Sequence, residues 1–177
     1  LGLVGVSDIP QAMPSDPLEH GLGAGSASFV IGRSDIAANV EGIHCSSLEI
    51  IGERYRKQGE LYLRDSGISA YTEQAFDQAL TISVTGLLTD LGVKAEEFAY
   101  AILQQFDGRI AYDIGRKLGF KDNQISPSMT VTKIGDSGSA SPLIGLCAVL
   151  DLARPGDRIL LSGYLGDHEI AILSRRE

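Results

Sequence analysis

The sequence predicts an α/β protein in which helices cover a sheet of mixed parallel and antiparallel strands. Short apolar stretches typical of strands alternate along the chain with longer segments whose apolar residues recur every three or four positions, as in a helix. The last two apolar stretches, residues 158–164 and 168–174, follow each other closely, which favours an antiparallel strand pair. This order of elements is typical of a layered α/β domain.

The first third of the chain is expected to contain three strands. Residues 1–8 form a short apolar stretch that runs into a proline-rich loop, and residues 26–32 form a second stretch. Partial alternation of apolar and polar residues predicts a third strand over 36–45, as an antiparallel neighbour. Residues 50–67 are irregular and charged, so we expect a surface excursion with one or two helical turns.

The middle of the chain predicts two helices with a strand between them. An apolar stripe at helical spacing predicts a first helix that ends at Gly92, and its members are Phe76, Leu80, Val84, Leu87, Leu88 and Leu91. Residues 98–103 are apolar and are expected to form a strand. A second helix is expected over 110–118, and Gly119 ends it.

A third helix is expected to begin at Ser141 and Pro142, as N-cap and first-turn residues. Cys147 lies on its apolar face and is most simply a core residue. Cys45, at the end of a predicted strand, has no neighbouring cation that would activate its thiol.

Composition excludes several classes of protein. The chain has 177 residues, enough for one sizeable core. With 15 Lys and Arg against 23 Asp and Glu, the net charge of -8 provides no basic surface for nucleic acid. The sequence has no stretch long and apolar enough for a membrane span, and its two cysteines favour a reducing cytoplasm. Because the chain starts without Met inside a predicted strand, we expect it to be a piece of something longer.

Three local features of the sequence could indicate a functional site. Gly21, Gly23 and Gly25 suggest a nucleotide-binding loop, but such a loop opens a helix, and here a strand follows. We expect these glycines to allow close backbone approach before a buried strand. No cluster of Cys, His and carboxylate residues has metal-ligand spacing, so no metal site is expected.

The sequence GDSGS at residues 135–139 resembles the nucleophile segment of chymotrypsin-like proteases. That chemistry needs a His oriented by a carboxylate on a double β-barrel. The three histidines of the chain lie in loop or strand-end contexts without a partner, and the segment leads into a helix. We therefore expect Ser137 and Ser139 to belong to a capping turn.

Three segments together carry a resemblance to a known family: GLGAGSASFVIG, then QQFDGRIAYDIGRKLGF, then IGDSGSASPLIGLCAVLDLARPGDRILLSGY. The chain resembles the thiolase superfamily, and within it the microbial hydroxymethylglutaryl-CoA synthases and type III ketoacyl synthases. The resemblance implies a layered α-β-α-β-α sandwich with mixed sheets, built from two similar halves. Residues 1–67 resemble the end of the first half with the connecting excursion, and residues 68–177 resemble the second half.

The resemblance also implies which residues occupy the site. The family His at the strand end is Gln104 here, and an Asn that helps to bind the thioester oxygen is Asp136. These two are the candidate catalytic positions, both substituted. Another family Asn is Asp107, and Arg109 matches an Arg near the pantetheine entrance, so both are candidate substrate-binding residues. The family's nucleophilic Cys lies upstream of any part of this chain.

Asp107 has a simpler explanation as the N-cap of the helix that begins at Gly108. Gln104 donates and accepts hydrogen bonds but does not shuttle a proton near neutral pH. An ionised Asp136 would repel a developing oxyanion that an Asn would stabilise.

Three functions remain open. In the first, the chain is part of a thiolase-fold acyltransferase assembly that acts on acyl-CoA or acyl-carrier-protein thioesters, with its own site degenerate and a thiolase-like partner or separate N-terminal half beside it. In the second, it is an active condensing enzyme with modified chemistry at Gln104 and Asp136, and its nucleophilic Cys comes from that separate portion. In the third, it is a non-catalytic module that binds a thioester or a partner. The thioester is a substrate, and no cofactor is expected.

The layered fold adds an expectation about assembly. A sandwich without its first ~100 residues leaves apolar sheet and helix surfaces uncovered, more than monomers normally tolerate. We therefore expect a homo- or hetero-oligomer.

Overall fold

The computed structural model of the chain describes residues 1–48, 54–64, 67–164 and 167–175, the last of these as backbone only. Its strands and helices follow in the order β1 (Gly2–Asp8), β2 (Gly25–Ile31), β3 (Ala38–Ser47), α1 (Ser69–Leu91), β4 (Tyr100–Ile102), α2 (Ile110–Lys117), α3 (Asp122–Ile125), α4 (Val131–Ile134), α5 (Ser141–Leu150), β5 (Arg158–Ser162) and β6 (Asp167–Arg175). A short 3₁₀ turn, η4 (Gly138–Ala140), precedes α5.

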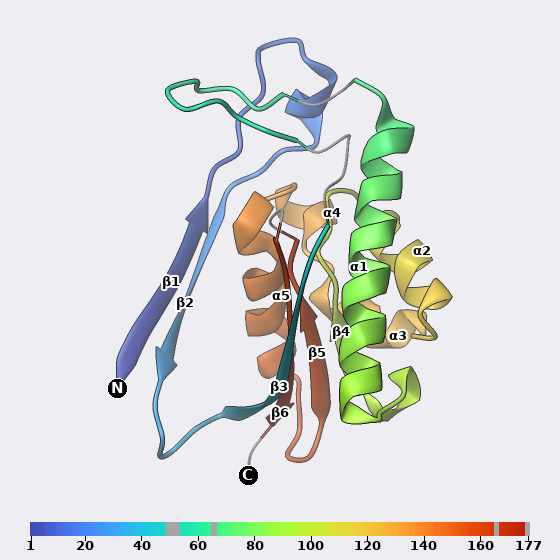
Figure 1. Cartoon of the computed structure of the whole chain (residues 1–177). Coiled ribbons are helices and arrows are strands. Elements are labelled where there is room, and N and C mark those ends of the chain that lie inside the picture. Colours follow the sequence, from blue (N-terminus) through green and yellow to red (C-terminus); the bar gives the residue numbers. More distant parts are fainter. Residues whose placement is uncertain (49–53, 65–66, 165–166, 176–177) are drawn as a thin grey trace.

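The strands form two separate sheets. A four-stranded sheet has the order β3-β6-β5-β4, in which β4 is parallel to β5 and the other pairs are antiparallel. The pair β1–β2 forms an antiparallel ribbon of its own. The mixed sheet and the final antiparallel pair were predicted correctly, but β3 pairs with β6 and not with its sequence neighbour β2. The reason is visible in Figure 1, where the chain crosses from the ribbon to the sheet between β2 and β3.

The elements stack in layers. Helix α1 packs on β3 and β6, whereas α5 contacts β4 and β5 with one side and β2 with the other. Figure 1 shows the resulting order, with α1 and α2 on one face of the sheet, α5 on the other face, and the β1–β2 ribbon outside α5.

The core lies on both faces of the central strands. On β4, Ala101 faces the cluster that includes Val84 and Leu87 of α1, and Ile102 faces the cluster around α5. On β5, Leu160 faces the same cluster as Ala101, and Ile159 faces the same cluster as Ile102. Because side chains alternate along a strand, this double burial explains why consecutive residues in the middle of both strands are apolar.

Helix α1 matches its predicted stripe closely. Leu80, Val84 and Leu87 are buried, whereas Leu91 in the last turn is exposed. Gly92 adopts φ 64°, and its N–H donates to the carbonyls of Leu88 and Thr89, which ends the helix as predicted. Among the described helices, none is long and apolar enough to cross a membrane.

Some local details differ from the predictions or were not predicted. In the described part of the excursion, residues 54–64, Tyr55 pairs with Arg64 across an antiparallel bridge and no helix is present. The expected helical turns over 50–67 stay a prediction, because residues 50–53, 65 and 66 lie outside the described residues. Ser141 is the first residue of α5 and makes no capping bond, because Ala140 occupies the N-cap position. Helices α3 and α4 were not predicted, since four residues are too few to establish a helical period. The division of the chain at residue 67 stays a prediction, although β3 from the first segment joins β6 from the second.

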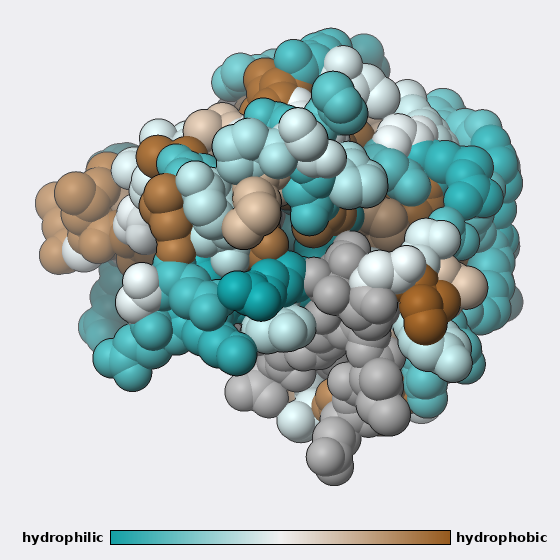
Figure 2. Space-filling model, turned by 90° about the horizontal axis from the view of Figure 1, so that it is seen from above, coloured by the Kyte–Doolittle hydropathy of each residue, from teal (hydrophilic) through white to brown (hydrophobic). Residues whose placement is uncertain are grey.

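The β1–β2 ribbon is more exposed than expected. Strand β2 was expected to be buried, but of its residues only Ala27 is buried. The elements that contact the ribbon, α5 and η4, leave much of it uncovered. Its exposed large apolar side chains are Leu1, Leu3, Val4, Val30 and Ile31. In Figure 2 apolar atoms gather at the left edge, the side on which the ribbon lies in Figure 1.

The glycines before β2 do allow close backbone approach, as predicted. A Cβ at Gly23 would overlap the carbonyl oxygen of Ile134. The N–H of Gly23 donates to the carbonyl of Asp136 at 2.8 Å, and the N–H of Asp136 donates to the carbonyl of Gly21 at 2.8 Å. The glycine segment therefore holds the loop that precedes α5.

Replacing Gly23 by Ala is expected to lower the free energy of unfolding by about 1–3 kcal/mol, because the backbone of Ile134 has to move away from the new methyl group. Urea unfolding followed by circular dichroism measures the effect. Gly2→Ala is the control, since nothing lies within 4 Å of a Cβ there, and it should leave stability nearly unchanged. Equal stability of the two variants would contradict the close contact.

Candidate functional site

A cavity of about 360 Å³ opens at the edge where β4 and β5 end. Because these strands are parallel, their carboxyl ends meet there, and Gln104 and Tyr164 follow them into the cavity wall. The other walls come from Asp8 at the end of β1, the first turns of α1, the excursion at residues 54–63, and the loop before α5. Segments far apart in the sequence thus converge on one site.

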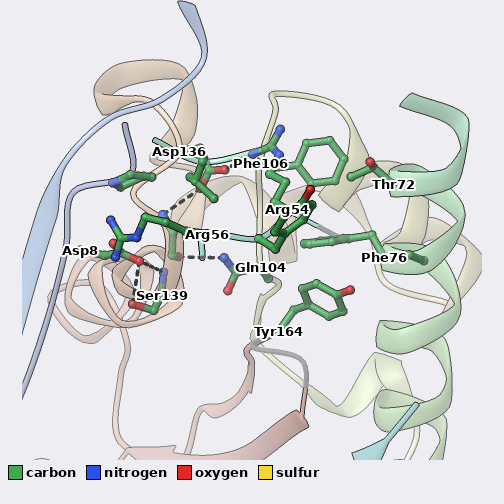
Figure 3. A pocket seen from close by; sticks show the side chains of 15 residues that line it. Asp8, Arg54, Arg56, Thr72, Phe76, Gln104, Phe106, Asp136, Ser139 and Tyr164 are labelled. Carbon is green, nitrogen blue, oxygen red and sulfur yellow. Dashed lines mark hydrogen bonds and ion pairs between the residues drawn. The ribbon is translucent and has the colours of Figure 1, made fainter. Parts of the chain in front are cut away.

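One side of the cavity is aromatic. Phe76 of α1 packs edge-on against Phe106 with ring centroids 4.8 Å apart, and Tyr164 tilts against Phe76 at 4.9 Å. Figure 3 shows these rings on one side of Gln104, with Asp8 and Ser139 on the other. The cavity therefore offers an apolar surface facing a polar one.

Gln104 lies between these two sides and is 5% exposed. Its Nε2 donates to the carbonyl oxygen of Gly138 at 2.9 Å. Its Oε1 is buried and has no hydrogen-bond partner. The neighbouring Gln105 differs, because its side chain bonds to the backbone of Ser128, Thr130 and Val131 and is fully used in holding that loop.

Asp136 is buried on the polar side, and both of its oxygens are engaged. Oδ1 accepts from the N–H of Gly138 at 2.9 Å, and Oδ2 accepts from a guanidinium nitrogen of Arg54 at 2.7 Å. Burial raises the pKa of Asp136, and the charge of Asp8 adds to this, whereas the Gly138 N–H and Arg54 oppose it. The structure thus brings both predicted catalytic positions, Gln104 and Asp136, into one cavity.

Arg54 was missed by the sequence analysis. It reaches the cavity from the excursion, and its guanidinium lies over the ring of Phe106, 5.2 Å from the centroid. Its Nε is buried without a partner. Arg56 also lines the cavity and is exposed. No motif marks either residue, because each is brought to the site only by tertiary folding.

Asp8 was also missed. Its Oδ2 accepts from both the N–H and the hydroxyl of Ser139 at 3.0 Å, which ties the end of β1 to the turn η4. Ser139 lies in that turn and Ser137 directly before it, as expected, but neither η4 nor α5 has a side-chain capping bond. Among the residues whose side chains the structure describes, no His lines the cavity. His44 pairs instead with Asp90 at 2.7 Å.

The two predicted substrate-binding residues lie outside the cavity wall. Asp107 caps α2, because its Oδ1 accepts from the N–H groups of Arg109 and Ile110 at 2.8 and 2.7 Å. Arg109 is exposed and forms ion pairs with Glu73 and Asp113 at 3.3 and 3.2 Å. Their contact with a substrate stays a prediction.

Neither cysteine belongs to the site. Cys45 is exposed and Cys147 partly buried, both thiols are free, and neither lines the cavity. Burial raises the pKa of Cys147, and the nearby Asp151 adds to the effect, so its thiol is held protonated. Within the described residues, no group of three or more His, Cys, Asp or Glu side chains is placed to hold a metal ion.

Comparison with known proteins finds relatives over most of the chain. The family model for the C terminal part of 3-oxoacyl-(acyl-carrier-protein) synthase III matches residues 88–169. Hydroxymethylglutaryl-CoA synthase of Methanopyrus kandleri is 36% identical over 163 residues, which are 92% of this chain and 46% of the relative. The same enzyme of Aeropyrum pernix is 36% identical over 162 residues, 92% of this chain and 45% of the relative. Over most of its length, the chain is thus similar in sequence to hydroxymethylglutaryl-CoA synthases.

Solved structures show the same thiolase-like fold. An HMG-CoA synthase complexed with CoA superposes with a TM-score of 0.84 at 18% identity, covering 99% of this chain and 49% of the other. The 3-oxoacyl-(acyl carrier protein) synthase III of Pseudomonas aeruginosa gives a TM-score of 0.69 at 17% identity, covering 87% of this chain and 50% of the other. The chain thus spans about half the length of the relatives that it matches.

A double-mutant cycle with Arg54→Met and Asp136→Asn is expected to give a coupling of about 2 kcal/mol at pH 7, because each single change leaves the other group buried without its partner. Urea unfolding of the four proteins measures it. Arg64→Met with Glu60→Gln is the matched control, since that pair is more exposed and should couple by less than about 0.5 kcal/mol. Equal coupling in the two cycles would contradict the buried pair.

The raised pKa of Asp136 predicts a pH dependence with a definite sign. The folded chain takes up a proton on Asp136 at a higher pH than the unfolded chain, whose carboxyl has the ordinary value of 3.8. The contribution of Asp136 to stability is therefore greatest below pH 3.8 and falls as the pH rises through the raised pKa. Unfolding of the wild type and Asp136→Asn at several pH values isolates this term. We expect the wild type to lose stability relative to Asp136→Asn as the pH rises. A gain in the stability of the wild type relative to the variant over the same pH range would contradict the raised pKa.

Proposed function

We propose that this chain is part of a thiolase-fold acyltransferase assembly, similar to hydroxymethylglutaryl-CoA synthase, that acts on acyl-CoA or acyl-carrier-protein thioesters. The chain contributes a cavity that binds and orients the acyl group, and a partner chain provides the nucleophilic Cys. The observation that carries the proposal is Gln104, which enters the cavity from the end of β4 but has no proton to exchange near neutral pH. The thioester is the substrate, and no further cofactor takes part.

Asp136 supports a binding role over a catalytic one. Stabilisation of an oxyanion requires donors aimed at the developing charge. Both oxygens of Asp136 are acceptors, and they already take bonds from Gly138 and Arg54. The same pair neutralises the charge of Arg54, so the usual oxyanion-binding group is absent from this position.

The positions of the two thiols and the exposed ribbon support the proposal that a partner chain is present. Cys45 and Cys147 lie outside the cavity, so the acyl nucleophile has to come from elsewhere in the assembly. The β1–β2 ribbon exposes five large apolar side chains, a surface typical of a protein interface. The two free thiols also suit a reducing compartment, and we place the assembly in the cytoplasm.

A second candidate function is favoured by the pKa of Asp136. A carboxyl whose pKa is raised inside a cavity is a candidate general acid or base, and Asp136 shares its cavity with Gln104. In that case the assembly has a complete active site. Gln104 and Asp136 take part in a modified condensation reaction, and the partner provides the nucleophilic Cys.

Labelling of the purified assembly with radioactive acetyl-CoA tests the proposal. After rapid denaturation, the label is expected on a partner chain and not on this chain, because its two thiols lie outside the cavity. The Cys45→Ser, Cys147→Ser double variant is the control and should leave the labelling unchanged. Label on this chain, or a stable lone monomer in native mass spectrometry, would overturn the proposal.

The identity of the partner separates the candidates. A complete thiolase-like chain beside this one would support the degenerate, acyl-orienting role. A partner that resembles only the first half and carries a Cys would favour the composite active enzyme. Tight binding of CoA without any acyl transfer would reduce the role to a binding module.

A further inference from the structure

One buried glutamine side chain has an oxygen that the protein leaves unused. The described part of the chain buries Gln104, Gln105 and Gln124. The Oε1 of Gln105 accepts from two backbone N–H groups, and the Oε1 of Gln124 accepts from the N–H of Lys121. The Oε1 of Gln104 is buried without a partner, and Gln104 lines the cavity. Buried polar atoms are normally paired, so this oxygen points to a ligand.

The neighbouring backbone fixes which end of the Gln104 amide is free. Its Nε2 lies 2.9 Å from the carbonyl oxygen of Gly138, which only accepts hydrogen bonds. Rotating the amide by half a turn would bring two acceptor oxygens together at this distance. The group without a partner is therefore the oxygen, so the unused capacity of Gln104, a cavity-lining residue, is that of an acceptor.

We propose that the cavity selects acyl chains that carry a hydroxyl group, that is, hydroxyacyl thioesters, and that Gln104 is the residue that recognises the hydroxyl. This inference rests on the proposed function, in which the cavity binds the acyl group. A ketone, a thioester carbonyl and an enolate oxygen all lack a proton to donate, so each would place an acceptor against the oxygen of Gln104. A hydroxyl donates to it.

The remaining walls suit the same ligand. The Nε of Arg54 is a buried donor without a partner in the same cavity, and a hydroxyl also accepts hydrogen bonds. Phe76, Phe106 and Tyr164 offer an apolar surface for the carbon chain (Figure 3). A hydroxyl next to Gln104 with its carbon chain on the rings therefore uses both sides of the cavity.

A CoA thioester also has donors in its pantetheine arm, namely two amide N–H groups and one hydroxyl. These are present in every CoA compound, whereas the 3-hydroxyl is present only in the hydroxyacyl chain. A set of ligands that differ only in the acyl chain therefore separates the two sources.

Isothermal titration of the purified assembly with 3-hydroxybutyryl-CoA, butyryl-CoA, acetoacetyl-CoA and CoA tests the proposal. We expect 3-hydroxybutyryl-CoA to bind about tenfold more tightly than butyryl-CoA, and acetoacetyl-CoA to bind no better than butyryl-CoA. Equal affinity of the hydroxy and unsubstituted chains would overturn the inference while the proposed function stands. Failure of all four ligands to bind would overturn the proposed function, and the inference with it.

The variant Gln104→Leu tests whether Gln104 causes the preference for the hydroxyacyl chain. The variant should bind 3-hydroxybutyryl-CoA and butyryl-CoA within about twofold of each other, because the acceptor is gone. Gln124→Leu is the matched control, since that amide is equally buried but paired within the protein and outside the cavity; it should lower the unfolding midpoint and keep the tenfold preference.

An equal loss of affinity for all four ligands in Gln104→Leu would assign the donor to pantetheine and overturn the hydroxyl proposal. If Gln104→Leu does not fold, the comparison of ligands on the wild type decides by itself.

Discussion

The parallel pairing of β4 with β5 sets the position of the cavity. Tyr100, Ala101 and Ile102 pair with Ile159, Leu160 and Leu161, so the two strands end side by side. Their inner residues are buried on both faces, and a slip by one residue would exchange those faces and expose one of the two clusters. The register is therefore firmly fixed, and with it the point at which the chain leaves each strand for the cavity wall.

A second constraint holds the polar wall in place. The loop before α5 exchanges two backbone hydrogen bonds with the glycine segment, and Asp8 accepts two more from Ser139. Both anchors lie where the ribbon strands meet their connecting loop, because Asp8 ends β1 and the glycine segment runs into β2. The ribbon is therefore more than an outer layer, because its ends fix the loop that carries Asp136 and the Gly138 carbonyl to which Gln104 donates.

Sequence reasoning succeeded where the signal was local. The stripe of α1, the stop at Gly92 and the double-sided apolar segments of β4 and β5 follow directly from side-chain periodicity. The positions of Gln104 and Asp136 came from the family resemblance, and the structure places both in one cavity. Periodicity does not report which strands pair or which face stays uncovered, so the partner of β3 and the exposure of β2 were mispredicted.

Arg54 shows why the rest of the site was not readable from the sequence. It sits in a charged, irregular stretch where an Arg normally faces solvent, and nothing local distinguishes it from Arg56 two residues on. It becomes a site residue only because Asp136 offers a buried carboxylate and Phe106 a ring face. Interactions across 82 residues of chain leave no local pattern to detect.

The charges of the cavity largely cancel, and this decides what chemistry its walls favour. Asp8 and Asp136 are each satisfied by protein donors, and the charge of Arg54 is balanced by Asp136. Inside a poorly solvated site, an acceptor oxygen facing the ligand disfavours a developing negative charge and favours a neutral donor. Walls of this kind hold and orient an acyl group better than they stabilise its enolate. Under the proposed role in acyl transfer, the groups that stabilise negative charge would therefore have to come from outside this cavity wall.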